Sequence, residues 1–179
     1  MIIYKDIISG DELCSDVFDM ELKGIVYEVN GKLITVGPTS VDTGANASAE
    51  GADADEGAED GAIQAIDIVY SNRLQSTSFD KKSYLTYMKG YLKSVVASIK
   101  EKAAKNNLSE EETEKLVKTF QASAQAFIKD VILANFKDYE FYTGESMNID
   151  GMVALLNYRE DGTTPYFTFF KDGLSEMKV

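Results

Sequence analysis

Two adjacent segments near the middle of the chain carry apolar residues at helical spacing, and this feature constrains the fold most. In residues 79–105 the apolar stripe consists of Tyr84, Met88, Tyr91, Leu92, Val95 and Ile99, with Asp80 at a suitable N-cap position. The second stripe consists of Leu116, Phe120, Ala124, Phe127 and Val131. Because only residues 106–108 connect the two segments, we predict an antiparallel helical hairpin over residues 80–133.

The start of the second helix is marked by the sequence Ser109-Glu110-Glu111-Glu112. The Ser109 hydroxyl can accept a hydrogen bond from the third backbone amide of the helix, while Glu112 reaches back to the N-cap amide. Three carboxylates also suit the positive end of the helix dipole. We therefore expect the second helix to begin directly after Ser109.

Strand-like segments rich in β-branched and aromatic residues lie on both sides of the helical region. They cover residues 2–8, 24–29, 32–36, 63–70, 141–143, 152–158 and 166–170. Asn30-Gly31 predicts a tight hairpin turn, and Asp161-Gly162 predicts the turn between the last two strands. Strands, then two helices, then strands again indicate an α+β fold, in one domain over residues 1–179.

Residues 37–62 differ from the rest of the chain in composition. These 26 residues contain 5 Gly, 7 Ala and 7 acidic residues, no basic residue, and Val41 as the one large aliphatic side chain. Such a segment has no apolar face to bury, and its carboxylates repel one another. We predict a mobile acidic loop between two strands.

The overall charge argues against several classes of function. The chain has 30 acidic and 18 basic residues, a net charge of -12, no His and one Cys. The negative charge disfavours nucleic acid as a main partner, and the missing residues remove Ser-His-Asp, Cys-His and disulfide chemistry. No apolar run is long enough to span a membrane, and the charged N-terminal segment does not resemble a signal peptide, so a cytoplasmic location is expected.

Two short motifs in the acidic segment could support chemistry. Val41-Asp42-Thr43-Gly44 resembles an aspartic protease signature, but that chemistry needs a clamped, buried carboxylate pair. The segment starting at Asp53 begins like a calcium loop, yet Gly57 and Gln64 occupy positions where oxygen ligands are expected. We therefore predict no enzyme, no catalytic residue and no tightly bound cofactor; weak calcium binding by the acidic loop stays open beside a purely solvated loop.

The predicted hairpin is electrostatically distinct, because residues 80–133 contain 10 Lys and 7 acidic residues. Four lysines recur at intervals of 7, 4 and 7 along one flank of the first helix: Lys82, Lys89, Lys93 and Lys100. This flank is either a solvated helix face or a docking face for an acidic protein surface. Cys14 has acidic neighbours, so no redox role is expected for its thiol.

Several stretches resemble the translationally controlled tumour protein family. The longest are residues 43–51 (TGANASAEG), 133–147 (LANFKDYEFYTGESM) and 158–165 (YREDGTTP). Residues 1–6 (MIIYKD), 11–13 (DEL), 77–79 (TSF) and 169–173 (FFKDG) match as well, so the resemblance covers the whole chain. It implies a twisted β core, called the β-tent, with a projecting helical hairpin and a mobile acidic loop.

The resemblance also implies partners. The core of this family is similar to chaperones of nucleotide-free Rab GTPases, which implies binding of a small GTPase of the Rheb type, and the implicated acidic residue of the family falls on Glu12. The chaperones hold zinc through cysteine pairs. This chain has Cys14 alone, so that metal is not carried over and any metal ligands are unknown.

The same resemblance implies an alternative function. The family is described as binding tubulin through the helical hairpin, stabilising microtubules, binding calcium, and associating with elongation factors and ribosomes. The lysine flank suits acidic tubulin tails, which would add an association with the cytoskeleton. We predict a non-enzymatic interaction protein in protein synthesis and growth control that handles a small GTPase at Glu12, with microtubule binding as the alternative.

Overall fold

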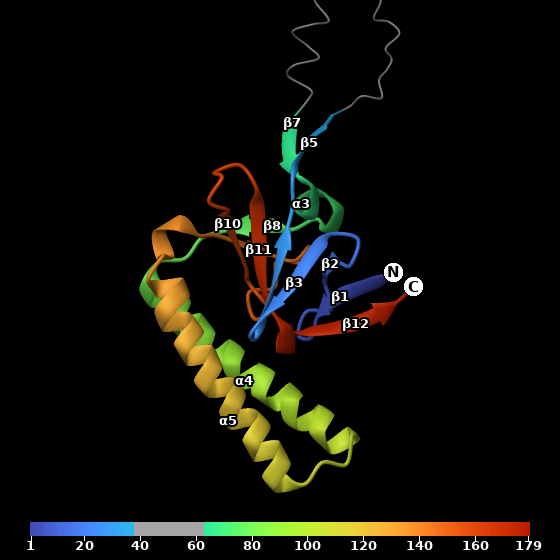
Figure 1. Cartoon of the computed structure of the whole chain (residues 1–179), viewed down its shortest axis with the longest axis vertical. Coiled ribbons are helices and arrows are strands. Elements are labelled where there is room, and N and C mark those ends of the chain that lie inside the picture. The colour runs from blue at the N-terminus through green and yellow to red at the C-terminus, as the bar shows by residue number, and fades with distance from the viewer. Residues whose placement is uncertain (38–62) are drawn as a thin grey trace, which may run out of the picture.

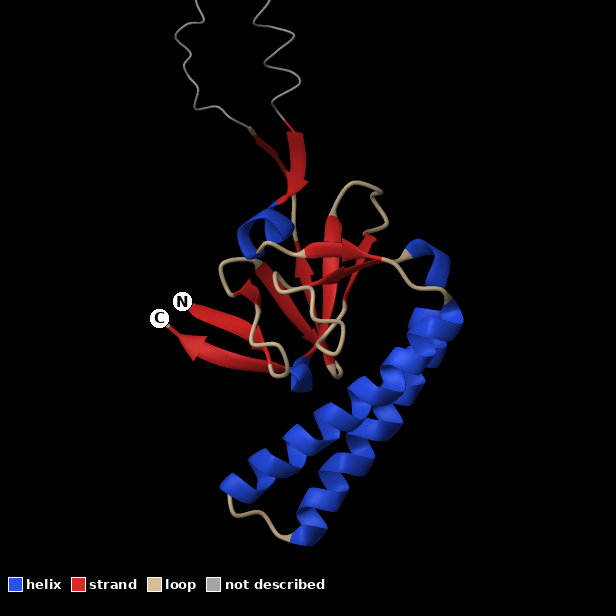
Figure 2. Cartoon of the chain, turned by 180° about the vertical axis from the view of Figure 1, so that it is seen from behind, coloured by secondary structure: helices blue, strands red, loops and turns tan. Residues whose placement is uncertain are grey.

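The structure is a computed structural model in which residues 1–37 and 63–179 are described (Figure 1). The predicted acidic loop therefore lies, apart from Gly37, outside the described residues. The described residues form antiparallel sheets and a long helical hairpin, which projects from one end of the β structure in Figures 1 and 2. The α+β class predicted from the sequence is confirmed.

The largest sheet has six antiparallel strands in the order β3-β4-β11-β10-β9-β8. These strands are β3 (Asp19–Lys23), β4 (Val26–Asn30), β11 (Pro165–Phe170), β10 (Ala154–Tyr158), β9 (Glu140–Thr143) and β8 (Gln75–Thr77). The predicted turn at Asp161-Gly162 joins β10 to β11, and Gly162 has a positive φ of 76°. Glycine adopts this backbone conformation without steric cost.

A second sheet joins the two ends of the chain. It has the order β12-β1-β2, with β1 (Ile2–Asp6) between β2 (Glu12–Ser15) and β12 (Leu174–Lys178). The short helix η4 (Lys171–Gly173) leads into β12. The amide of Val179 donates to the carbonyl of Met1 at 2.9 Å, so the two termini lie side by side (Figures 1 and 2).

The predicted hairpin at Asn30-Gly31 is wrong. β4 pairs with β3 and β11, whereas β5 (Leu33–Val36) pairs with β7 (Ile63–Ile66) in a separate two-stranded sheet. A tight turn of this type requires a positive φ at Gly31, and Gly31 does not have one. It is needed for space instead, because a Cβ there would lie 2.7 Å from Oδ1 of Asp67. The chain therefore passes at this point from the six-stranded sheet into the two-stranded sheet, without a tight turn.

The predicted strand at residues 63–70 is correct in its first half alone. After β7 the chain forms α3 (Asp67–Asn72). The Asp67 carboxylate stabilises the helix start by accepting hydrogen bonds from the amides of Ile68 at 2.8 Å and Lys32 at 3.0 Å. Ile68 is fully buried while Tyr70 is exposed, so tertiary packing overrides the local β preference.

The helical hairpin forms as the local signals predict. In α4 (Lys81–Lys105), the Asp80 carboxylate accepts from the amide of Ser83 at 2.7 Å. In α5 (Glu110–Phe127), the Ser109 hydroxyl accepts from the amide of Glu112 at 3.1 Å. Both helices have reciprocal capping boxes, which satisfy backbone amides that the helix itself leaves unpaired.

The turn between the helices depends on one left-handed residue. Asn107 has φ 58°, and the amide of Leu108 donates to the carbonyl of Ala103 at 3.0 Å. The amide of Asn107 donates to the carbonyl of Ala104 at 3.1 Å, which completes a Schellman motif. Asparagine tolerates this conformation better than most side chains, so the turn can form without glycine.

The buried stripe of the second helix matches the predicted one at its centre and is shifted by one residue at its two ends. Leu116 is 47% exposed, whereas its neighbour Val117 is buried. Phe120 and Ala124 are buried as predicted, and the stripe continues through Ile128 and Ile132 of the π-helix η2 (Ile128–Leu133). In α4 the predicted stripe is largely correct, with Tyr84, Met88, Tyr91 and Val95 buried.

Aromatic side chains attach the hairpin to the six-stranded sheet. Phe141 of β9 lies 5.5 Å from Tyr84 and 5.4 Å from Phe136, measured between ring centroids; Phe136 begins the short helix η3 (Phe136–Asp138). Phe170 of β11 lies 6.2 Å from Tyr91 and 5.9 Å from Phe127. These contacts bury large apolar surfaces, so the sheet end of the hairpin belongs to the main core.

No helix in residues 1–37 and 63–179 is both long enough and apolar enough to cross a lipid bilayer.

Candidate functional site

The predicted GTPase-binding residue Glu12 is exposed at the start of β2, where it lines a polar pocket of about 390 Å³. Four parts of the chain meet there: β1, the β1–β2 turn with β2, the end of α3, and the loop between β9 and β10. The pocket is lined by Lys5, Gly10, Asp11, Glu12, Ser71, Asn72, Arg73 and Glu145. A mixed set of charges around an exposed carboxylate suits recognition of a charged protein surface.

The turn that precedes Glu12 is held by the buried carboxylate of Asp6. This carboxylate accepts hydrogen bonds from the Ile8 amide at 3.0 Å and the Ser9 hydroxyl at 2.8 Å. Gly10, with φ 79°, makes the turn possible, and the Asp6 amide donates to the carbonyl of Asp11 at 2.9 Å. The position at which β2 begins is therefore set by the turn.

Asp11 connects this turn to the β9–β10 loop. Its carboxylate accepts from the Ser146 hydroxyl at 2.6 Å and from the Ser146 amide at 3.2 Å. Any Cβ at Gly144 would overlap the Asp11 side chain, so glycine is required for this close approach. No periodic pattern predicts this contact, although Asp11 and residues 144–146 both lie in stretches that carry the family resemblance.

Two residues beside the pocket have left-handed backbone without being glycine or asparagine. Arg73, which ends α3, has φ 54°. Met147 has φ 59° and lies two residues after the pocket residue Glu145. The guanidinium of Arg73 binds the carboxylate of Glu145 at 3.0 Å, with both side chains largely exposed. Such conformations cost free energy and concentrate at functional sites. Sequence reasoning missed both residues because neither type signals a turn.

The four predicted lysines lie on one exposed flank of α4. Lys89, Lys93 and Lys100 line a groove of about 510 Å³ between α4 and α5. The apolar side chains of the groove are Leu92, Val96 and Ala97, and α5 contributes Gln121 and Gln125. Lys82 is exposed on the same flank, outside the groove lining. Within the described part of the chain, none of the four lysines forms an ion pair.

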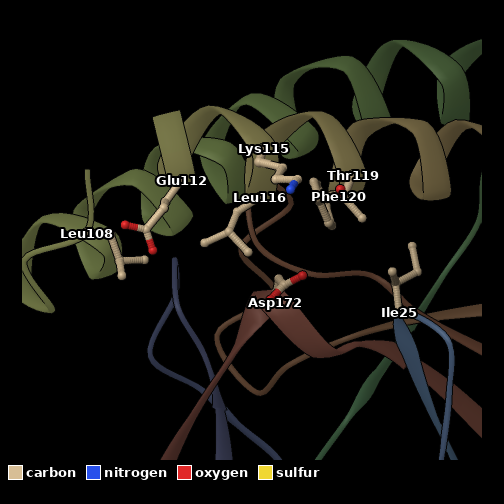
Figure 3. Close-up of a pocket in the computed structure, with 8 residues that line it drawn as sticks. All are labelled: Ile25, Leu108, Glu112, Lys115, Leu116, Thr119, Phe120 and Asp172. Atoms are coloured by element: carbon tan, nitrogen blue, oxygen red, sulfur yellow. The ribbon is translucent and has the colours of Figure 1, made fainter. Parts of the chain in front are cut away.

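A second cleft lies between α5 and the β structure (Figure 3). It has a volume of about 560 Å³, and Leu116, Lys115 and Phe120 of α5 face Ile25 and Asp172 across it. The exposure of Leu116 is explained by this opening, since its side chain points into the cleft (Figure 3).

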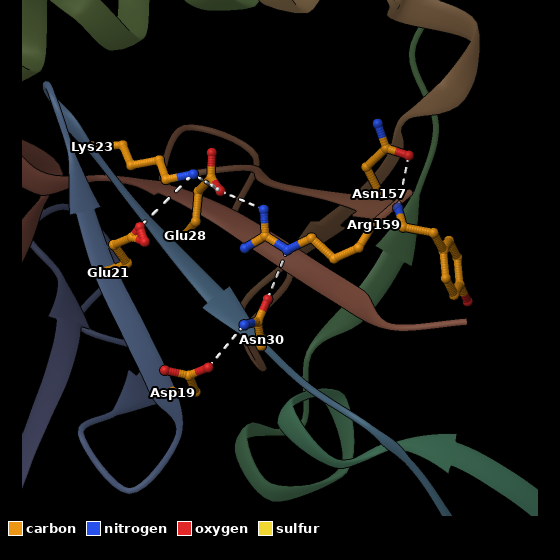
Figure 4. Close-up of polar contacts among 8 residues, drawn as sticks. Asp19, Glu21, Lys23, Glu28, Asn30, Asn157 and Arg159 are labelled. Carbon is orange, nitrogen blue, oxygen red and sulfur yellow. Dashed lines mark hydrogen bonds and ion pairs between the residues drawn. The ribbon is translucent and has the colours of Figure 1, made fainter. Parts of the chain in front are cut away.

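Arg159 organises a polar network on the six-stranded sheet (Figure 4). Its guanidinium donates to Glu28 at 2.6 Å and to Asn30 at 2.8 Å, and it lies 3.8 Å from the centroid of the Tyr166 ring. Glu28 also binds the ammonium of Lys23 at 3.3 Å. These charges pair with one another, so the network links β3, β4 and β11 to the loop that follows β10.

The remaining candidates contribute no described site. Cys14 lies in β2 and is fully buried, and this burial raises the pKa of its thiol to about 12. Asp42 and Asp53 lie outside the described residues. Within residues 1–37 and 63–179, no three acidic or cysteine side chains are grouped as metal ligands would be.

Comparison with known proteins decides the family. The family model described as translationally controlled tumour protein matches residues 1–175. A translationally controlled tumour protein homologue from Neurospora crassa is 57% identical over the full length of both chains. The chain belongs to the translationally controlled tumour protein (TCTP) family. A TCTP homologue from Alternaria alternata, 56% identical over both full lengths, agrees.

Solved TCTP structures agree with the fold. The translationally controlled tumour-associated protein p23fyp from Schizosaccharomyces pombe has a TM-score of 0.77 and 52% identity, with complete coverage of both chains. TCTP from Caenorhabditis elegans has a TM-score of 0.62 at 24% identity, covering 100% of this chain and 99% of its own. The second match supports the fold alone.

Proposed function

We propose that this TCTP-family chain is a non-enzymatic interaction protein that binds a small GTPase of the Rheb type at the Glu12 pocket. The observation that carries the proposal is the exposed Glu12 side chain, which lines a polar pocket and directly follows a turn held by hydrogen bonds to Asp6. The turn before Glu12 is ordered before binding, which lowers the entropic cost of association. Within the described residues the Glu12 carboxylate forms no ion pair, so its charge is available to the partner.

The proposed mechanism follows from charge. A nucleotide site holds phosphate through a lysine and Mg²⁺, and a carboxylate near that site competes for either of them. Glu12 would then favour the nucleotide-free or exchanging state of the GTPase. Growth control and protein synthesis are the processes in which we expect this contact to act.

The test is an amide-shift titration of the isotopically labelled chain with the nucleotide-free GTPase. We expect shifts at Glu12 and at its neighbours Asp11, Arg73 and Glu145. Glu12→Gln keeps the shape and removes the charge, so it should weaken binding about tenfold. Glu160→Gln, at an exposed position before the β10–β11 turn, is the matched control and should bind like the wild type. Saturating GTPase without shifts would refute the proposal.

The lysine groove supports a second candidate function, binding of the acidic tails of tubulin. Lys89, Lys93 and Lys100 lie together without internal ion-pair partners in the described residues, so their charge is available. Lys89→Glu with Lys93→Glu should weaken cosedimentation with microtubules, and added salt should weaken the wild type. Lys102→Glu with Lys105→Glu changes the same charge elsewhere on α4 and is the control. Unchanged binding of the first pair at low salt would refute this role.

A further inference from the structure

The loop between β9 and β10 exposes two large apolar side chains beside the Glu12 pocket. Met147 is 58% exposed and Ile149 is 62% exposed, and Glu145 of the same loop lines the pocket. Single exposed apolar residues are common on protein surfaces. Two on one short loop, next to a proposed binding pocket, suggest a contact with an apolar partner surface.

The loop is held at both ends by side chains from other elements. At its start, the Asp11 carboxylate accepts from the Ser146 hydroxyl at 2.6 Å. At its end, the Asp6 carboxylate accepts from the Met152 amide at 2.8 Å, and the Tyr87 hydroxyl donates to the Gly151 carbonyl at 2.6 Å. A side chain presented on a fixed loop is ordered before binding, which lowers the entropic cost of association.

The backbone at Met147 is held in a conformation that its side chain disfavours. Its φ of 59° suits glycine or asparagine, yet methionine occupies the position. A hydrogen bond from the Met147 amide to the Gly144 carbonyl at 3.0 Å keeps the turn closed. Glycine would relieve the strain and remove the apolar side chain, so stability and the proposed contact can be separated at this position.

The charges around the two side chains define the partner. Glu12 lies in the adjoining pocket and Asp150 directly follows Ile149; within the described residues neither forms an ion pair. Glu145 is balanced by Arg73. Lys5 also lines the pocket and forms no ion pair with a described residue, so one lysine stands against Asp11, Glu12 and the nearby Asp150. The surface therefore combines apolar side chains with a border that is acidic on balance, which is complementary to an apolar hollow bordered by lysine or arginine.

We infer that Met147 and Ile149 are the apolar anchor of the partner-binding face, and that they enter an apolar hollow with a basic border on the bound protein. This inference rests on the proposed function, because it extends the interface at the Glu12 pocket to the β9–β10 loop. Anchors of this kind dominate the binding free energy of protein interfaces, while polar groups at the edge set orientation.

The test is a titration of the full chain, methyl-labelled at Met and Ile, with the nucleotide-free GTPase. We expect the Met147 and Ile149 methyl resonances to shift on binding. Met147→Gly and Ile149→Ser should each weaken binding about tenfold. The melting temperature should not fall for Met147→Gly. Val17→Ser, which changes a 66% exposed residue between β2 and β3, is the matched control and should bind normally.

The outcomes separate this inference from the proposed function. If Glu12→Gln weakens binding but both loop variants bind like the wild type, the anchor is refuted and the GTPase site stands. If the wild type does not bind, both are refuted. Methyl shifts that depend on protein concentration without the GTPase would identify a second copy of the chain as the occupant, which also overturns the inference.

Discussion

Two tyrosines one turn apart on α4 differ in whether their hydroxyl is hydrogen-bonded within the described part of the chain, so replacing each by phenylalanine measures what those hydrogen bonds contribute to stability. The Tyr87 hydroxyl donates to the Gly151 carbonyl at 2.6 Å and accepts from the Val153 amide at 2.9 Å. The Tyr91 hydroxyl is buried and has no hydrogen-bond partner among the described residues. Tyr87→Phe and Tyr91→Phe both keep the ring, so the stacked pair, with centroids 5.6 Å apart, is preserved.

The two changes should have opposite effects on the free energy of unfolding. Tyr87→Phe leaves the Gly151 carbonyl and the buried Val153 amide without a partner, at about 1–3 kcal/mol for each group. Because the Tyr87 side chain is only half-buried, we expect a total loss of about 2–4 kcal/mol. Burial of an unpaired hydroxyl costs about 1–3 kcal/mol, so Tyr91→Phe should be neutral or stabilise the fold by about 1 kcal/mol.

The measurement is urea unfolding of the full chain followed by far-ultraviolet circular dichroism, since the chain has no Trp to report by fluorescence. A midpoint that falls for Tyr87→Phe and holds or rises for Tyr91→Phe agrees with the structure. Equal losses for both variants would refute the reasoning, because they would mean that the Tyr91 hydroxyl is as well bonded as that of Tyr87.

Three further changes test other parts of the structure. Hydrogen bonds from Thr164 and Thr163 lower the pKa of Asp161 from 3.8 to about 2. The stability that these bonds provide is therefore present above pH 3.8 and is lost as the pH falls towards 2. Thr164→Val removes the hydroxyl and should raise the pKa of Asp161 in a carboxyl-carbon NMR titration. Burial raises the pKa of Cys14 from 9.0 to about 12, so its contribution to stability should fall as the pH rises between these values. Cys14→Ala should make this dependence less steep in urea unfolding; the part that remains comes from buried tyrosines such as Tyr84 and Tyr91, whose pKa values burial also raises. Gly31→Ala should destabilise by about 2 kcal/mol in the same assay, because the new Cβ meets the Asp67 carboxylate.

Each of these has a result that contradicts it. If Thr164→Val leaves the pKa of Asp161 unchanged, the Thr164 hydroxyl is not what lowers that pKa. Parallel pH dependence of Cys14→Ala and the wild type would show that the thiol does not couple to folding. Wild-type stability of Gly31→Ala would mean that the approach of Asp67 is not tight.

The helical hairpin could be predicted from the sequence because its signals are local. Asp80 and Ser109 cap the helices as predicted, through contacts three residues along the chain. The capping box at Ser109 is the predicted one, whereas the box that Ser83 completes with Asp80 was not predicted. The predicted stripe of the second helix is wrong at Leu116, where Val117 is buried instead, because periodicity indicates a face but not which edge of that face a neighbour covers. The cleft beside Leu116 depends on the β structure and has no local signal.

The strand prediction is partly correct: β3, β8 and β12 have no counterpart among the predicted segments, and of the two predicted turns the one at Asp161-Gly162 is confirmed. Asn30-Gly31 has the composition of a tight turn, but β4 binds β3 and β11, and the partner of β5 is β7. Turn propensity is worth less free energy than the burial of Val26 and Val29 in the six-stranded sheet. The same competition converts the second half of residues 63–70 into α3, where Ile68 enters the core.

The α+β class, the two helix N-caps and the exposed lysine flank follow from the amino-acid sequence alone, and the family resemblance singles out Glu12. Only the tertiary structure placed Glu12 beside Arg73 and Glu145, and joined Asp11 to Ser146. Helix caps and helix faces arise from residues a few positions apart, so they can be recognised in the sequence. The pocket and the fixed loop arise from segments distant in the chain, whose meeting depends on sheet pairing and on the packing of the whole core.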